Sequence, residues 1–279
     1  MSIRVNSQNR STMSALRHSS KHQNNLQKTM EKLSSGKRIN RAADDAAGLA
    51  IAQKMGEMLR GLEQGMENVF DGLSLTQVAD GAVSQAADNM LRMKELAMTS
   101  ANGTLNEDQR AAVQQEFDSL KAEVTRIAES TEFNGKKLLD GSAGQLDIAA
   151  GTSGGSGPDV LTLDLGQSLD AGSLGLAATR VDGADPSNAL NAMADIDNAL
   201  AQLSGARSQF GSFSNRLESA QRGLAVSMEN TYAAQSRIQD ADYAVETANM
   251  ASQQILGQAG NSVLAQSQGL AGTALNLLK

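Results

Sequence analysis

Apolar residues recur at alternating intervals of three and four along two long stretches of this chain that contain no proline. The longest series begins at Met193 and keeps one register as far as Ala259. The prolines of the chain, Pro158 and Pro186, lie between the two stretches, so neither stretch carries the kink that an interior proline imposes on a helix. A spacing of three and four maintained over many heptads is typical of coiled-coil packing rather than of a globular core.

The heptad spacing predicts three long helices, over about 44–100, 105–129 and 190–238. The link between the first two is short, so we expect them to be antiparallel neighbours. The spacing also predicts that Lys32–Ala52 and Ile238–Gln266 are each one continuous helical segment. Aromatic residues make up only 3% of the chain, which favours many small aliphatic contacts along long elements over a compact core.

The middle of the chain has a different composition. Residues 141–187 contain ten of the 26 glycines and both prolines. Apolar and polar residues alternate over 146–148 and 161–165, as in half-buried strands, and 151–159 would be the loop between them. The expected fold class is therefore mostly α: a long antiparallel helical bundle or coiled-coil rod with a small β-hairpin region in the middle of the chain.

The two ends of the chain differ in charge. Residues 1–41 carry nine basic residues and one acidic residue, whereas residues 240–279 carry three acidic residues and one basic residue. Opposite charge favours pairing of the two ends, although two solvated faces would carry the same charges. Two helices alone bury one thin seam, which scarcely offsets the conformational entropy of ordering them. We therefore predict that about 40 residues at each end are disordered in a free monomer and become helical when other copies cover them.

Groups that could carry chemistry are few. His18 and His22, the only histidines, are four residues apart, but no third ligand lies nearby, and the chain has no cysteine. Asp44 and Asp45 are better placed to cap a helix than to act as a catalytic pair. We expect no enzyme activity, no cofactor and no metal.

Two further classes of partner are disfavoured. The basic N-terminal segment has no aromatic residue for base stacking, so nucleic-acid binding is not expected. No apolar run approaches about 18 residues, so membrane insertion is not expected either. The same segment is basic, serine-rich and poor in acids, as organellar transit peptides are, but that interpretation leaves the matching C-terminal helix unexplained.

Several long segments resemble those of one protein family. KLSSGKRINRAADDAAGLAIA, Lys32–Ala52, resembles the N-terminal signature of the bacterial flagellins. The likeness continues through Gly72–Ala82, Leu91–Thr104 and Thr131–Gly141, returns at Gly211–Ala220, Met228–Ala244 and Ile255–Gln266, and ends with Leu275–Leu278. It covers about four fifths of the chain and is present at both ends.

The resemblance implies a division of the chain into layers of a helical filament. Residues 1–43 and 240–279 would form an inner layer of paired terminal helices, 44–140 and 188–239 a helical rod outside it, and 141–187 a short variable Gly-rich β-hairpin region. The apolar residues of the terminal helices would then form the seam of the polymer core. The candidates are Leu16, Leu26, Met30, Leu33, Val245, Ala248, Ile255, Ala259, Leu277 and Leu278.

The resemblance also implies a function and a set of partners. The chain would be an extracellular structural subunit that polymerises into the flagellar filament used for swimming, exported by the flagellar type III system without a cleaved signal peptide. Expected partners are further copies of the chain, an export chaperone at the C-terminal arm, and the filament cap and hook-junction proteins. Two alternatives stay open: a hook–filament junction protein, which shares the terminal motifs, and a secreted coiled-coil adhesin or translocator.

A host partner is implied residue by residue. Flagellins sensed by the innate-immune Toll-like receptor present an arginine, a leucine and a glutamate, and the matching positions here are Arg92, Leu96 and Glu116. The chain departs from the usual pattern at Leu91 and Lys94. On the simpler interpretation, Arg92 and Glu116 are solvated charges of a rod.

Overall fold

The computed structural model describes residues 2–151, 157 and 159–276, with side chains described between 13 and 266. It confirms a mostly helical chain with a small hairpin region in the middle. The elements are α1 (Ser2–Ser35), α2 (Ala46–Ser100), α3 (Glu107–Ser130), β1 (Glu132–Phe133), β2 (Lys136–Lys137), β3 (Gln145–Ala149), β4 (Val160–Asp164), α4 (Ser187–Gln239) and α5 (Tyr243–Asn276).

The chain divides into two compact units. The core unit comprises residues 60–229, and the terminal unit comprises residues 1–59 and 230–279. Helices α2 and α4 contribute residues to both units.

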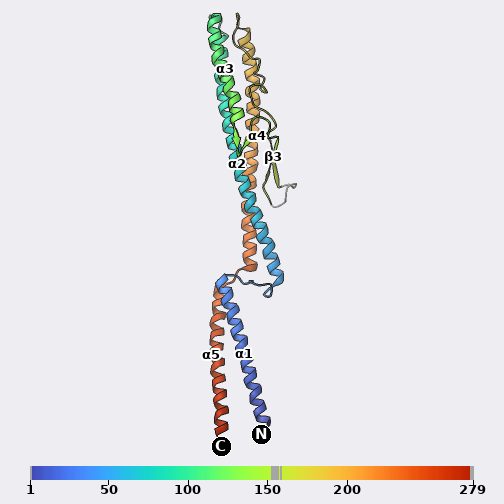
Figure 1. Ribbon diagram of the computed structural model, residues 1–279, viewed down its shortest axis with the longest axis vertical. Helices are drawn as coiled ribbons and strands as arrows, with labels where there is room; N and C mark the ends of the chain where they lie inside the picture. The colour runs from blue at the N-terminus through green and yellow to red at the C-terminus, as the bar shows by residue number, and fades with distance from the viewer. Residues whose placement is uncertain (1, 152–156, 158, 277–279) are drawn as a thin grey trace. The chain divides into compact units, whose positions relative to one another are not determined.

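The core unit is a bundle of α2, α3 and α4, with the hairpins beside it (Figure 1). α3 runs antiparallel to α2 after a short link, as the sequence predicts. Asn106 caps α3: its side chain accepts a hydrogen bond from the Gln109 backbone N–H, and the Gln109 side chain accepts one from the Asn106 backbone N–H. This reciprocal capping satisfies two of the donors that a helix start leaves free, so α3 begins where the link ends.

The hydrophobic core follows the predicted heptads. Val83, Met90 and Met93 of α2 are fully buried, as is Phe117 of α3. The α4 side of the core repeats the same spacing. Its fully or almost fully buried residues are Ile196, Leu203, Phe210, Phe213 and Leu217. The regular interdigitation of these rows is the packing that the spacing of three and four predicts.

Two β-hairpins cover part of the bundle. β3 and β4 pair antiparallel with Leu146 opposite Leu163, which confirms the predicted hairpin. β1 and β2 form a second hairpin, in which Glu132 pairs with Lys137. Its two turn residues, Asn134 and Gly135, have φ values of 50° and 77°, the geometry that an Asn-Gly turn between paired strands favours.

Both predictions of a continuous helix at the ends of the chain are wrong. α1 ends at Ser35 and α2 begins only at Ala46. Gly36 has a φ of 69°, which lies outside the helical region and is readily adopted by glycine. The Asp45 carboxylate then accepts a hydrogen bond from the Gly48 backbone N–H at 2.9 Å, which caps α2 as the sequence predicts.

The second interruption lies at residues 240–242, between α4 and α5. The Asp242 carboxylate accepts hydrogen bonds from the backbone N–H groups of Ala244 and Val245, at 2.9 and 3.3 Å. Asp242 therefore starts a new helix although the apolar spacing continues through it. The series from Met193 to Ala259 is thus carried by two helices rather than one.

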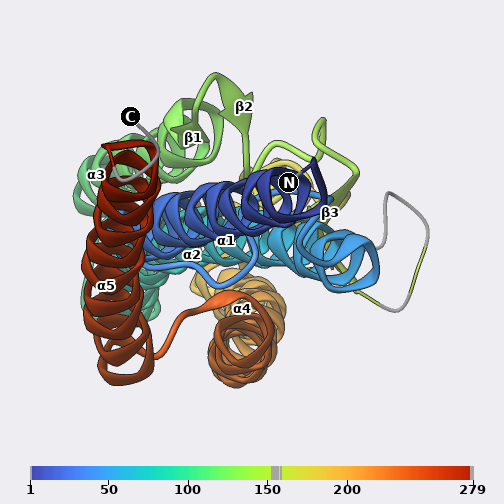
Figure 2. The same ribbon diagram turned by 90° about the horizontal axis from the view of Figure 1, so that it is seen from below.

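Within the terminal unit, α1 and α5 run beside each other from the two interruptions toward the ends of the chain. Near the interruptions, the Tyr243 hydroxyl donates to the Leu33 carbonyl at 2.6 Å. The two views show the helices further apart toward the termini (Figure 1, Figure 2).

Candidate assembly surfaces

The two helix interruptions are joined by backbone hydrogen bonds. The Arg38 N–H donates to the Gln239 carbonyl at 2.6 Å, and the Ala241 N–H donates to the Gly36 carbonyl at 2.9 Å. The Arg38 guanidinium adds a bond to the Ile238 carbonyl at 2.7 Å. Carbonyls and amides that the interrupted helices leave free therefore satisfy one another, which fixes where α1 and α5 start to run together.

The seam between α1 and α5 has its own heptad spacing. On α1 one series of half-buried or buried residues is Ala15, Ser19, His22, Leu26, Thr29 and Leu33. On α5 they are Glu246, Met250, Gln253, Gly257, Gly260 and Leu264. Both sets step by four and three, so one stripe of each helix faces the other.

Polar contacts across this seam use the opposite charges of the two ends. Lys32 lies 3.5 Å from the Glu246 carboxylate, which agrees with the expected pairing of a basic and an acidic arm. His22 lies 2.9 Å from the Gln253 side-chain oxygen, with its Nδ1 in the contact. The structure therefore places His22 in a helix–helix contact.

The seam buries little apolar surface. Among the side chains described in the terminal unit, those that are buried are Thr29, Ile39, Ala52 and Leu59. Leu26 and Leu33, two of the predicted seam residues, are only half-buried. The core unit buries many more apolar side chains than this seam does. The difference agrees with a helix pair that is too thin to be stable by itself.

Most of the other predicted seam residues lie on the exposed sides of the two helices. Leu16 and Met30 of α1 are 54% and 49% exposed, and Val245 and Ile255 of α5 are 54% and 66% exposed. Ala248 and Ala259 are exposed as well, whereas Leu277 and Leu278 lie outside the described residues. Further large apolar residues exposed on these helices lie outside the predicted set, among them Met13, Leu256 and Val263. Exposed apolar side chains gathered on one helix, as on α5, are typical of a site of association.

The three residues matched to the receptor-binding pattern do not share one surface. Arg92 of α2 forms ion pairs of 2.9 Å with Glu95 and with Glu116 of α3. The hydrogen bond that Arg92 donates to Glu95, followed by the one that it donates to Glu116, raises the pKa of Arg92. Leu96, in contrast, is only 6% exposed and belongs to the hydrophobic core.

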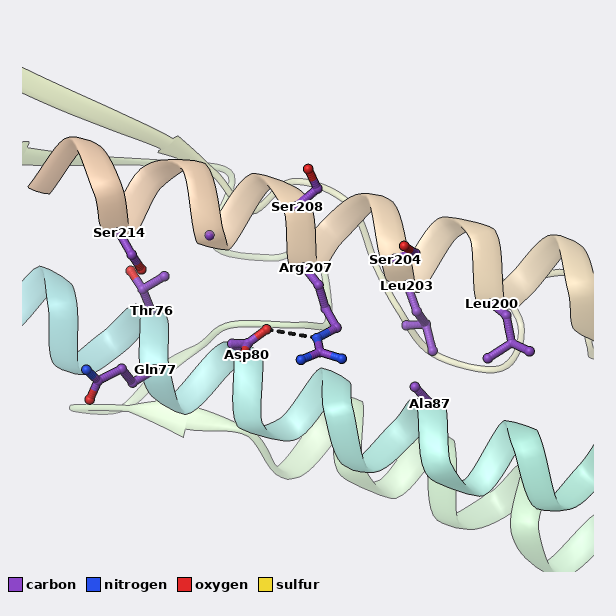
Figure 3. A pocket seen from close by; sticks show the side chains of 11 residues that line it. Thr76, Gln77, Asp80, Ala87, Leu200, Leu203, Ser204, Arg207, Ser208 and Ser214 are labelled. Carbon is purple, nitrogen blue, oxygen red and sulfur yellow. Dashed lines mark hydrogen bonds and ion pairs between the residues drawn. The ribbon is translucent and has the colours of Figure 1, made fainter.

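A hollow of about 660 Å³ follows the junction of α2 and α4 in the core unit. Arg207 of α4 reaches across it to the Asp80 carboxylate of α2, at 3.0 Å. Figure 3 shows this pair with Thr76 and Ser214 on one side of it and Ala87 and Leu203 on the other. The Arg207 position interrupts the apolar series of α4. The helix tolerates a charged residue there because the side chain is about half exposed and its guanidinium is paired with Asp80.

Over the described parts of the chain, no three His, Asp or Glu side chains lie close enough together to hold a metal ion. In the same residues, no helix is both long and apolar enough to cross a membrane.

Comparison with known proteins assigns the family. Residues 6–144 match the bacterial flagellin N-terminal helical region, and residues 193–278 match the bacterial flagellin C-terminal helical region. The chain belongs to the bacterial flagellin family. Members of this family are structural proteins of the flagellar filament, which lies outside the cell, and they are not enzymes.

The sequences of individual relatives are similar to this chain over almost its whole length. A flagellin of Halalkalibacterium halodurans is 41% identical over 96% of this chain and 97% of its own length. The flagellar filament 30.7 kDa core protein of Treponema maltophilum is 37% identical over 97% of this chain and 98% of its own. These names support a filament subunit and give no support to a junction protein or an adhesin.

One solved structure bears on the fold alone. A putative flagellar hook-associated protein from Vibrio parahaemolyticus matches 71% of this chain and 100% of its own, with a TM-score of 0.57 and 12% identity. At that identity, the likeness is one of architecture.

Proposed function

We propose that this chain polymerises with copies of itself into a flagellar filament through the exposed apolar sides of α1 and α5. The observation that carries the proposal is the exposure of Leu16, Met30, Val245 and Ile255 beside a seam that buries little else. A head-to-tail contact that does not close on itself generates an open helix of subunits. Each arm is then covered by several neighbours, which supplies the burial that one pair of helices lacks.

In this proposal the terminal helices, 1–43 and 240–279, form the inner layer, and the rod residues 44–140 and 188–239 lie outside it. Residues 141–187 are the short variable region. The interruptions at 36–45 and 240–242 support boundaries near residues 43 and 240.

The export chaperone, the hook-junction protein and the cap would all contact the terminal helices. We propose that the chain is exported by the flagellar type III system without a cleaved signal peptide. An apolar α5 that is uncovered before assembly would need a chaperone in the cytoplasm. The same exposed surfaces would meet the hook-junction protein at one end of the filament and the cap at the other.

Truncation of the C-terminal arm tests the polymer proposal. Deletion of residues 260–279 removes part of α5, so we expect a soluble protein whose core unit is folded but which does not extend filament seeds. Sedimentation and electron microscopy of seeded samples measure the outcome, with the full chain as the control. Normal filaments from the truncated chain would refute an inner layer built from the terminal helices.

Binding of the monomer to the innate-immune Toll-like receptor is a second proposal, supported by the exposed ion pair of Arg92 with Glu116. Because Leu96 is buried, the contact would rest on the charged residues. Replacement Arg92→Ala should then weaken binding of purified monomer to the receptor ectodomain at least tenfold. An unchanged affinity would leave Arg92 as a solvated charge of the rod.

A further inference from the structure

One side of α1 carries a stripe of basic residues. Arg17, Lys21 and Lys28 follow one another at intervals of four and seven residues, so they lie on one face of the helix. They line a hollow of about 540 Å³ together with Asn24, Glu31 and Arg41. Polar amide side chains and cationic groups thus dominate this face, which is distinct from the α5-facing stripe.

No direct ion pair neutralises this stripe among the described residues of the terminal unit. Among the described residues, Arg17, Lys21 and Lys28 form no ion pair within 4.0 Å. Glu31, the one carboxylate in the hollow, is already paired with Arg41 at 2.9 Å.

The nearby acids of α5 and of the helix interruptions are engaged elsewhere. Glu246 pairs with Lys32, and Asp242 caps α5. Asp44 accepts hydrogen bonds from the backbone N–H groups of Arg41 and Asn40. The bond from Arg41 is the main cause of the lowered pKa of Asp44, and the charges of Lys28 and Lys32 lower it further.

A complementary stripe lies on α2. Glu63, Glu67 and Asp71 are exposed and follow one another at intervals of four residues. None of them forms an ion pair among the described residues, and Arg60, one turn earlier, forms none either. Like charges four residues apart on a helix repel each other, so this stripe destabilises α2 unless a cation approaches it.

The charge of the whole chain favours contact between copies. Residues 1–41 hold nine of the 24 basic and one of the 31 acidic residues, so the rest of the chain holds 15 basic and 30 acidic residues. A polymer of such chains would bring many acidic rods together, and their repulsion opposes assembly unless each copy offers a cationic surface to its neighbour.

We propose that the basic stripe of α1 (Arg17, Lys21 and Lys28) binds the acidic stripe of α2 (Glu63, Glu67 and Asp71) of a second copy. The contact rests on the proposed polymerisation and is heterologous, so it extends from copy to copy. Arg17 and Lys21 share the four-residue spacing of Glu63 and Glu67, about 6 Å along a helix. The four-carbon stem of Lys28 lets its ammonium reach toward Asp71.

Continuity with the polymer surface argues for a second copy as the occupant. Leu16 and Met30, exposed on α1, flank the basic stripe in sequence. A neighbour that covers these apolar residues would also bring its charges within reach of Arg17 and Lys28. The apolar contacts would then supply affinity, while the charges would set register and partner choice.

Charge reversal in the full-length chain tests the contact. The acidic variant carries Arg17→Glu, Lys21→Glu and Lys28→Glu, and the basic variant carries Glu63→Lys, Glu67→Lys and Asp71→Lys. We expect each variant alone to raise the critical concentration for seeded polymerisation at least about tenfold, because like charges then face each other. An equimolar mixture should return it to within about threefold of the natural chain, since each variant's α1 then meets the other's oppositely charged α2.

A matched control separates this contact from net charge. Lys54→Glu, Lys136→Glu and Arg222→Glu change three exposed basic residues by the same amount outside the stripe, and this variant should polymerise within about threefold of the natural chain. Circular dichroism of each monomer reports whether the core unit is folded.

Each outcome decides between distinct alternatives. If the natural chain does not extend seeds, the proposed function fails and the contact fails with it. If the natural chain polymerises and either reversal variant does so equally well, only the contact is wrong. If the six reversals restore assembly when combined in one chain but the mixture does not, the stripes pair within a chain, and the proposed contact between copies is also wrong.

Discussion

At the scale of single residues, Arg110 holds two segments of the core unit together. Its guanidinium donates to the carbonyls of Ser100 and Asn102, at 3.1 and 3.4 Å, and to those of Gly183 and Ala184, at 3.2 and 3.0 Å. The residue is 3% exposed. One buried side chain therefore joins the α2–α3 link to the segment before α4, a role that its place at the start of α3 did not reveal in the sequence.

Replacement Arg110→Ala should lower the free energy of unfolding of the core unit by about 2–4 kcal/mol, because several buried carbonyls lose a charged donor. Urea unfolding of the monomer, followed by circular dichroism, measures the change. A lysine at this position keeps the charge but cannot reach all four carbonyls. The free energy of unfolding of Arg110→Lys should therefore lie between those of the natural chain and of Arg110→Ala. Arg222→Ala, at an exposed arginine, should stay within about 0.5 kcal/mol of the natural chain. A similarly small effect at Arg110 would contradict the assigned role.

At the scale of elements, Gly72 of α2 sets how closely β3 approaches the bundle. A Cβ added at Gly72 would overlap the Cδ1 atom of Ile148 and approach a methyl of Leu217 at 3.3 Å. Gly81, two and a half turns later on α2, has nothing within 4 Å of an added Cβ. The two glycines therefore separate the effect of packing from that of helix propensity.

Replacement Gly72→Ala should destabilise the natural chain, because overpacking costs about 1–3 kcal/mol and the gain in helix propensity is about 1 kcal/mol. Ile148→Val removes the obstructing Cδ1, so Gly72→Ala should become stabilising in that background. Gly81→Ala should stabilise both backgrounds by up to about 1 kcal/mol. Free energies of unfolding for this double-mutant cycle measure the coupling, and additive effects at Gly72 and Ile148 would show that they are not in contact.

The elements also show what the sequence can and cannot predict. The three long helices and the β3–β4 hairpin follow from apolar periodicity, because each of those patterns is buried against a partner in the same chain. The interruption at 240–242 does not, because the apolar spacing continues through it. The interruption at 36–45 is indicated only at its end, where Asp44 and Asp45 are expected to cap a helix. Both interruptions depend on local capping by Asp45 and Asp242, which competes with the helix.

The spacing of apolar residues along a helix is easier to predict than the side of the helix that a single chain buries. α5 carries two interleaved series, one through Met250 and Gly257 that faces α1, and one through Val245 and Ile255 that is exposed. Hydrophobicity alone favours the second, more apolar series as the seam, and that series is the one left without a partner in a single chain. Burial within one chain and burial in a polymer select different sides of the same helix.

At the scale of the whole molecule, the distribution of burial separates a part that is stable alone from a part that needs neighbours. The hydrophobic core of buried residues runs from Leu62 to Leu224, within the core unit. In the terminal unit, α1 and α5 share a half-buried seam and a small number of polar contacts. Opening of that seam exposes little additional apolar surface, so it costs far less free energy than opening of the core.

Amide hydrogen exchange tests this difference directly. In the monomer, amides of α1 and α5 should exchange within seconds to minutes, while those of α2 and α4 around Met90 and Leu203 should be protected for much longer. In filaments, α1 and α5 should become protected to a level near that of the core, because neighbouring copies cover Leu16, Val245 and Ile255. Mass spectrometry of both states measures the change, and α3, which is folded in both, is the internal control. Strong protection of the arms in the monomer would mean that they fold without neighbours, and their ordering would then contribute nothing to the cooperativity of assembly.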